Sequence, residues 1–184
     1  MRALIHLLKY EQVLTVAKPL GALLAQTVQA MPNLPPQLTV VAVPLHPAKE
    51  RQRGFNQTML LAEQAARVLR HEDKTRHFSM ALRALGRQRA TESQSGLSSH
   101  QRRRNLRGAF FVVQPKAIQD RAVLLLDDIY TTGATARECT RTLLAGGAAS
   151  VYVATLARSQ REGVALWDAP VMSSTRETEN SLQQ

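Results

Sequence analysis

The chain has 184 residues, 44% of them hydrophobic, with 24 Lys and Arg against 14 Asp and Glu and a formal charge of +10. This length excludes a second large domain, and no apolar run approaches the roughly 20 residues of a membrane span. The positive charge favours polyanionic partners such as nucleic acid, phosphorylated metabolites or acidic lipid headgroups, and does not choose among them.

The first third of the chain is predicted to be helical. Apolar residues from Leu20 to Met31 recur with the helical period on one face, and Pro32 ends this pattern. Leu38 to Val43 is a β-branched run typical of a buried strand. The strand leads into the turn Val43-Pro44-Leu45-His46-Pro47, so this turn is expected at a strand's carboxyl end.

The middle of the chain alternates between periodic and polar segments. Positions from Leu61 to about His71 predict a second amphipathic helix, and Met80 to Leu85 is predicted to be a strand. Gly86 to Ser99 is polar, with few apolar anchors, and is expected to be an exposed, mobile loop. Gln101 to Leu106 is predicted to be a short helix that Gly108 ends.

The last part reads as strand, strand, helix, strand. Ala109 to Val113 and the wholly apolar Ala122 to Leu126 are the predicted strands. A helix is expected from about Thr135 to Gly146-Gly147, followed by a strand from Val151 to Ala157. This order predicts an α/β fold, an open and mostly parallel sheet flanked by helices, with ligands at the strands' carboxyl ends.

The strongest chemical signal is Val-Leu-Leu-Leu-Asp-Asp-Ile-Tyr-Thr-Thr-Gly-Ala-Thr at 123–135. Backbone N–H groups at a helix start, with threonine hydroxyls beside them, form a cradle for a phosphate. Asp127 and Asp128 would repel that phosphate, so we assign them to sugar hydroxyls, with a metal ion to offset their charge. A plain Asp-capped helix is the alternative, but a cap needs only one such residue. The predicted phosphate loop consists of Tyr130, Thr131, Thr132, Gly133, Ala134 and Thr135.

This stretch resembles the phosphoribosyl-pyrophosphate binding motif of type I phosphoribosyltransferases, in which four apolar residues, two acidic residues and a Thr-Gly-rich turn bind ribose 5-phosphate. The resemblance implies the type I phosphoribosyltransferase-like fold, with Asp127 and Asp128 as catalytic residues near the ribose. It also implies Mg²⁺ that enters with phosphoribosyl pyrophosphate and has no direct protein ligand.

A second resemblance narrows the family. Segments 43–47, 53–57 (Arg-Gly-Phe-Asn-Gln) and 104–110 are similar to signature segments of the ComF group (competence protein F, GntX-like), and the similarity covers roughly residues 4–158. In this fold the loop after the first strand usually holds pyrophosphate. The alternative is a proline-shaped turn with solvated basic residues. The resemblance assigns the pyrophosphate loop to Leu45, His46, Arg51 and Arg53.

The polar segment at 86–99 resembles the mobile loop that closes over substrate in these enzymes. Its candidate substrate contacts are Arg87, Arg89 and Gln94, because closure would exclude water and bring cations to the leaving pyrophosphate. A solvated basic linker is the competing interpretation.

Members of this group commonly begin with a four-cysteine zinc ribbon, whereas this chain has one cysteine, Cys139. We therefore expect no zinc; either the ribbon is lost or the start lies after it. We divide the chain into an N-terminal helical segment at 1–37 that is a candidate hood, a phosphoribosyltransferase-like core at 38–158, and a polar tail at 159–184 predicted to be disordered.

Three functions compete. The first is a phosphoribosyltransferase, a pentosyl-transferring enzyme of unknown acceptor that acts in DNA uptake and natural transformation. The second is a non-catalytic competence protein that binds single-stranded DNA and a helicase or translocase, with a regulatory or vestigial phosphoribosyl site. The third is a nucleobase salvage phosphoribosyltransferase. Without a signal peptide, we expect a cytoplasmic protein, alternatively peripheral at the inner face of the membrane. The oligomeric state is not predicted.

Overall fold

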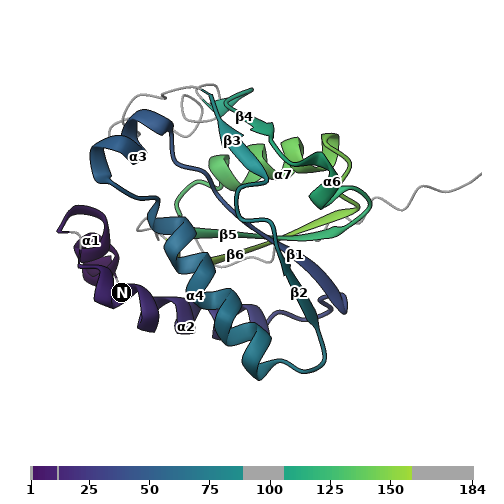
Figure 1. The fold of residues 1–184 in the computed structure, drawn as a ribbon, viewed down its shortest axis with the longest axis horizontal. Coiled ribbons are helices and arrows are strands. Elements are labelled where there is room, and N and C mark those ends of the chain that lie inside the picture. The colour runs from purple at the N-terminus through teal and green to yellow at the C-terminus, as the bar shows by residue number, and fades with distance from the viewer. Residues whose placement is uncertain (1, 12, 89–105, 159–184) are drawn as a thin grey trace, which may run out of the picture.

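The computed structural model describes residues 2–11, 13–88 and 106–158. Its centre is a parallel sheet with the strand order β2-β1-β5-β6 (Figure 1). The bounds are Gln37–Ala42 for β1, His77–Met80 for β2, Ala122–Tyr130 for β5 and Ser150–Arg158 for β6. The predicted open, parallel α/β architecture is confirmed. A smaller antiparallel sheet pairs β3 (Leu85–Arg87) with β4 (Phe110–Val112).

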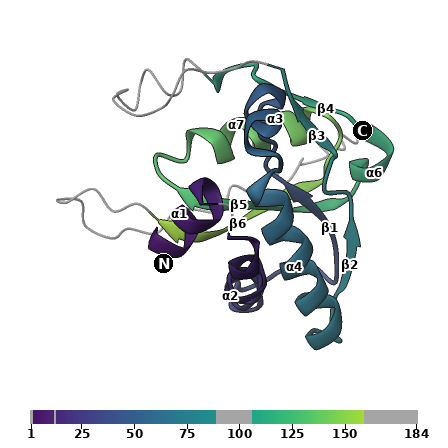
Figure 2. The same cartoon turned by 60° about the vertical axis from the view of Figure 1, so that its left-hand side comes forward.

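Helices cover both faces of the parallel sheet (Figures 1 and 2). On one face lie α2 (Ala17–Gln29) and α4 (Gln57–Glu72), preceded along the chain by α1 (Arg2–Tyr10), the 3-10 turn η1 (Leu14–Val16) and α3 (Pro47–Arg53). On the other lie α6 (Pro115–Ile118) and α7 (Ala134–Ala145). In both views α1 stands at the end of the sheet where β5 and β6 end. None of the described helices is long and apolar enough to cross a membrane.

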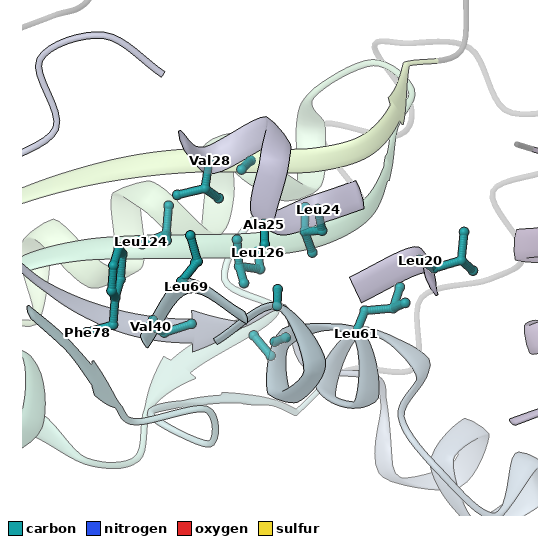
Figure 3. Close-up of a cluster of buried hydrophobic side chains, with 14 of the residues drawn as sticks. Leu20, Leu24, Ala25, Val28, Val40, Leu61, Leu69, Phe78, Leu124 and Leu126 are labelled. Atoms are coloured by element: carbon teal, nitrogen blue, oxygen red, sulfur yellow. The ribbon is translucent and has the colours of Figure 1, made fainter. Parts of the chain in front are cut away.

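The first core lies between the sheet and the pair α2 and α4 (Figure 3). Strand residues alternate between faces, so Val40 of β1 and Leu124 and Leu126 of β5 point into this core. They meet Leu24 of α2 and Leu69 of α4, all fully buried. The helix predicted from apolar periodicity before Pro32 is therefore confirmed as α2, which is part of the layer that covers the sheet.

The second core lies on the opposite face. Val41 of β1 and Val123 and Leu125 of β5 pack there against α7 and the small sheet. Cys139 of α7 is buried in this core as a free thiol, and burial raises the pKa of the thiol well above its ordinary value. Because both faces are covered, β5 is apolar throughout up to Leu126, as expected for a central parallel strand.

The strand predicted from Met80 to Leu85 is wrong. The parallel strand β2 ends at Met80, the chain turns at Ala81 to Ala84, and Leu85 begins a different strand in the small sheet. The apolar run is continuous because some of its residues pack in the first core and others in the second. Hydrophobic periodicity does not distinguish one core from the other. Gly86 and Arg87, expected in a mobile loop, are residues of β3; residues 89–99 lie outside the described ranges.

Two further boundaries differ from the sequence prediction. The strand expected to end at Leu126 continues to Tyr130, because β6 extends alongside and pairs Asp127 with Thr155 and Tyr130 with Arg158. Residues 47–53, which follow the first strand, form the helix α3. Pro47 lies in its first turn, where the missing N–H of proline is not needed. The predicted helix at 101–106, apart from its last residue, and the predicted tail at 159–184 lie outside the described residues.

Candidate functional site

The site lies between β1 and β5, the two strands whose following helices cover opposite faces of the sheet. From β1 the chain passes through α4 on one face to β2, and from β5 it passes through α7 on the other face to β6. Such a switch point leaves a crevice at the carboxyl ends of the two central strands. A cavity of about 240 Å³ opens there. Its lining consists of Val43, Pro44, Leu45, Asn56, Gln57, Thr58, Arg87, Asp127, Asp128, Ile129, Thr131 and Thr135.

Two helices begin at this cavity, and their N-termini differ. The amide oxygen of Asn56 accepts hydrogen bonds from the backbone N–H of Thr58 at 3.0 Å and of Met59 at 3.4 Å, so α4 is capped. Within the described ranges, α7 has no side-chain cap, since its N-cap residue is Gly133. The first N–H groups of α7 are thus the ones available to an anion.

The turn before α7 depends on a glycine for two reasons. Gly133 has φ +72°, a left-handed conformation that side chains disfavour. A Cβ at this position would lie 2.1 Å from the Tyr130 hydroxyl. Tyr130 is in turn covered by the Arg158 guanidinium, 5.6 Å from the ring centre. The hydroxyl oxygen of Thr132 is buried without a hydrogen-bond partner among the described residues, so this turn holds an unsatisfied polar group.

The two carboxylates of β5 have different surroundings. Asp127 accepts a hydrogen bond from the backbone N–H of Asp128 at 2.8 Å. Asp128 is 5% exposed and accepts a hydrogen bond from the Gln57 side-chain amide at 3.2 Å. The N-termini of α4 and α7 stand beside them, and the positive ends of both helix dipoles favour negative charge at this edge.

Gln57 belongs to a polar chain that the sequence analysis did not identify. Its carbonyl oxygen accepts a hydrogen bond from the Arg53 guanidinium, and its amide group donates to Asp128. Asn56 also donates to the backbone carbonyl of Val43 at 3.4 Å. An Asn before an apolar-periodic run is a recognisable cap signal. The contact of Gln57 with Asp128 spans 71 residues and has no local signal.

Arg87 contributes the cation on the side of the small sheet. Its guanidinium lies 5.4 Å from the centre of the Phe110 ring, which supports it by a cation–π contact. Burial lowers the pKa of Arg87, while nearby Cys139 and Asp127 act in the opposite direction. An arginine with its very high ordinary pKa stays charged under such conditions, so the cavity contains a positioned positive charge.

The residues predicted for the pyrophosphate loop differ in how they lie relative to the cavity. Leu45 lines the cavity, but His46 and Arg51 are not part of its described lining. The His46 ring instead caps α3, accepting the Ala48 N–H at 3.2 Å, and Arg51 is exposed on that helix. Arg53 reaches the site through Gln57. Of the predicted loop contacts, Arg89 and Gln94 lie outside the described residues.

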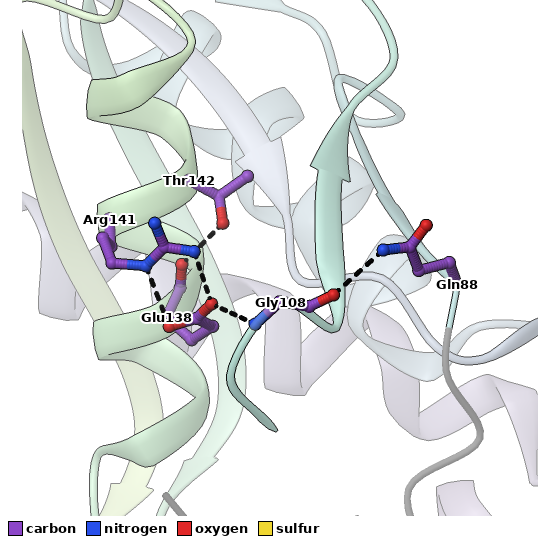
Figure 4. A network of polar contacts seen from close by, with 5 residues as sticks. All are labelled: Gln88, Gly108, Glu138, Arg141 and Thr142. Atoms are coloured by element: carbon purple, nitrogen blue, oxygen red, sulfur yellow. Dashed lines mark hydrogen bonds and ion pairs between the residues drawn. The ribbon is translucent and has the colours of Figure 1, made fainter. Parts of the chain in front are cut away.

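A second polar network fixes α7 from its exposed side (Figure 4). Glu138 accepts hydrogen bonds from the Gly108 N–H at 2.7 Å and from two guanidinium nitrogens of Arg141, at 2.7 and 3.1 Å. Gln88 donates to the Gly108 carbonyl at 3.0 Å. The pKa of Glu138 is lowered, chiefly by the hydrogen bonds from Arg141. Burial acts in the opposite direction and is the smaller effect. The segments entering and leaving 89–105 are thus tied to the helix that begins at the site.

The donor set suits a magnesium ion that arrives with a phosphate ligand. Across the described ranges, no three His, Cys, Asp or Glu side chains gather as a metal cage. Mg²⁺ is commonly bound through one or two carboxylates together with substrate phosphates. Asp127 and Asp128 at the cavity supply oxygens of that kind.

The comparisons with known proteins identify the family of the chain. The family model described as phosphoribosyl transferase domain matches residues 57–183, which include α4, the small sheet, β5 and the start of α7. The chain belongs to the phosphoribosyl transferase domain family. Among solved structures, the allosteric regulatory enzyme of purine biosynthesis is similar at 18% identity, with a TM-score of 0.49 over 77% of this chain and 26% of that one.

Curated relatives of this chain carry names that refer to DNA utilization or to competence. DNA utilization protein YhgH of Escherichia coli K12 is 37% identical over 159 residues, 85% of this chain and 66% of that protein. Competence protein F of Haemophilus influenzae is 34% identical over 65% of this chain and 50% of that protein. The predicted ComF relationship is confirmed. The chain spans slightly under two thirds of the length of the first of these relatives.

Proposed function

We propose that this protein binds phosphoribosyl pyrophosphate together with Mg²⁺ at the carboxyl edge of its sheet. The observation that carries the proposal is the uncapped N-terminus of α7, preceded by the buried Thr132 hydroxyl and adjoining two carboxylates. A phosphate accepts hydrogen bonds from such N–H groups, and a sugar ring donates its hydroxyls to carboxylates. A phosphorylated ribose carries both a phosphate for the N–H groups and hydroxyls for the carboxylates.

Each described group has a distinct role in this proposal. The turn at 131–135 holds the 5-phosphate, and Asp128 and Asp127 accept hydrogen bonds from the ribose hydroxyls. Arg87, fixed on Phe110, supplies positive charge for the diphosphate. Magnesium, when bound, neutralises part of the diphosphate charge and makes it a better leaving group.

The reaction that such a site favours is transfer of the phosphoribosyl group. When the bond between ribose C1 and pyrophosphate breaks, positive charge develops on the ring and negative charge on the leaving group. Carboxylates near the ring and cations near the diphosphate stabilise both charges. The nucleophile that forms the new bond to C1 is left open, because the described residues of the cavity include no histidine as an evident base for it.

The cellular role we propose is in DNA uptake or utilization, supported by the names of the relatives. A non-catalytic DNA-binding protein is the second candidate, and the formal charge of +10 favours it. Exposed arginines occur at several places along the described chain, including Arg51 on α3 and Arg83, Arg107 and Arg121 between elements. Affinity for single-stranded DNA that falls steeply with salt, and does not change with phosphoribosyl pyrophosphate, would favour this candidate.

Isothermal titration with phosphoribosyl pyrophosphate and Mg²⁺ tests the proposal directly. We expect micromolar binding by the unmodified chain and a loss of at least about tenfold in Asp128→Asn, because a hydrogen bond to a charged group is removed. Asp120→Asn is the matched control, since Asp120 is exposed at the other end of the sheet. No binding by a folded sample, or equal loss in both variants, contradicts the proposal.

A further inference from the structure

The segment Arg53-Gly54-Phe55-Asn56-Gln57 connects α3 to α4, and two of its residues, Asn56 and Gln57, line the cavity. From these contacts we infer that Gln57 is a positioning residue, which Arg53 orients and which in turn orients Asp128. This inference rests on the proposed function, because orienting Asp128 matters only if that carboxylate binds ribose hydroxyls.

Gln57 is oriented by its two neighbours. A side-chain amide has an acceptor at one end and two donors at the other. Its carbonyl oxygen meets the Arg53 cation and its NH₂ group meets the Asp128 anion. Reversing the amide would place a donor against the cation and an acceptor against the carboxylate. Only one orientation satisfies both partners, so one face of Asp128 is occupied and its remaining lone pairs are directed elsewhere.

Burial makes this chain of hydrogen bonds consequential. Gln57 is 7% exposed and Asp128 is 5% exposed, so water is a poor substitute partner for either. A buried carboxylate that loses a hydrogen bond is destabilised more than an exposed one. The backbone supports the geometry, because Gly54 has φ +85° at the end of α3 and Asn56 joins the start of α4 to the carbonyl of Val43.

Gln57→Glu gives the sharpest test because it retains the shape. A protonated carboxyl can donate to Asp128 and accept from Arg53, as the amide does, whereas the ionised form cannot donate. The charged groups around this position are Arg53 on α3, Asp127 and Asp128 on β5, and Arg87 on β3. We therefore expect Gln57→Glu to bind phosphoribosyl pyrophosphate at least about tenfold more weakly than the unmodified chain at pH 8.

Gln57→Leu lacks both the donor and the acceptor, so it should also bind phosphoribosyl pyrophosphate more weakly than the unmodified chain. Gln52→Leu is the matched control, because Gln52 is exposed on α3 outside the cavity lining. Unchanged affinity in Gln57→Glu and Gln57→Leu, or an equal deficit in Gln52→Leu, overturns the inference.

A ligand-free measurement separates this inference from the proposed function. In the NMR spectrum of the unliganded protein, the Gln57 side-chain NH₂ signals should shift and exchange faster with water in Asp128→Ala and in Arg53→Gln. Unchanged signals in both variants overturn the positioning role even if the protein binds phosphoribosyl pyrophosphate. Shifted signals in a protein that binds no phosphoribosyl pyrophosphate support the hydrogen-bonded chain and contradict the proposed function alone.

Discussion

The two ends of the parallel sheet each have a cavity, and the cavities are similar in size but not in chemistry. At the carboxyl ends the cavity measures about 240 Å³ and contains buried Asp128 and Gln57. At the amino ends a cavity of about 280 Å³ is lined by residues that include Asp120, Arg121 and His77, all of them exposed. Volume therefore does not identify the site, and the arrangement of polar groups does.

The difference follows from the direction of the strands. Parallel strands place the starts of their following helices at one edge of the sheet, so α4 and α7 both present their N-termini to the carboxyl edge. The amino edge receives helix C-termini and turns. Its buried hydroxyl, on Thr39, already has a partner in Ser79 at 3.1 Å. Among the described residues, the carboxyl edge retains the uncapped N-terminus of α7 and the unsatisfied Thr132 hydroxyl, whereas the buried Thr39 hydroxyl at the amino edge already has a partner.

The largest expected contrast comes from two glycines at opposite ends of α7, both with left-handed backbone. Gly133→Ala and Gly147→Ala should each lose about 1–2 kcal/mol of stability from backbone strain. Only Gly133→Ala should also weaken phosphoribosyl pyrophosphate binding, by about tenfold or more, because the new Cβ displaces Tyr130 from the turn. At Gly147 the Cβ meets the flexible end of Gln119.

Urea unfolding and isothermal titration of both variants measure these effects. Equal weakening of binding in the two variants would indicate that general loss of stability, and not the geometry of the turn, controls affinity.

An intermediate effect is expected where α7 is tied down. Glu138→Gln should lower the free energy of unfolding by about 1 kcal/mol near neutral pH, because hydrogen bonds to a charged group are weakened. The pKa of Glu138 is lowered in the folded state from its ordinary value of 4.5. Its contribution is therefore present above pH 4.5 and lost as the pH falls through the folded-state value.

Urea unfolding at pH 7 and near pH 3 checks this expectation. The difference in stability between the unmodified chain and Glu138→Gln should shrink at the lower pH. A difference that grows there would show that the carboxylate is not stabilised by Arg141 and Gly108.

The smallest effect is expected at the amino edge. Thr39→Val removes the hydrogen bond to Ser79 and should cost about 0.5–1.5 kcal/mol of stability. Ser79 keeps an acceptor in the Leu38 carbonyl at 3.4 Å. Affinity for phosphoribosyl pyrophosphate should not change in titration of this variant. A loss of affinity would show that the two ends of the sheet are coupled and do not act independently.

Much of this protein was determined by local patterns in the sequence. The apolar run before Asp127, the turn containing Gly133 and the periodic helices predicted the parallel sheet and the turn that leads into α7. These features depend on residues close along the chain, because hydrogen bonding within helices, turn conformation and strand burial leave a local periodicity. The family resemblance depended on the same contiguous segments.

The tertiary structure alone decided which distant side chains meet. Gln57 contacts Asp128, and Arg53 contacts Gln57, because α4 starts where β5 ends. Arg87 lines the cavity because β3 belongs to the small antiparallel sheet and not to the parallel one. His46, predicted as a pyrophosphate contact, caps helix α3, and neither it nor Arg51 is part of the described cavity lining. Contacts of this kind depend on the packing of whole elements, so no single stretch of the sequence contains them.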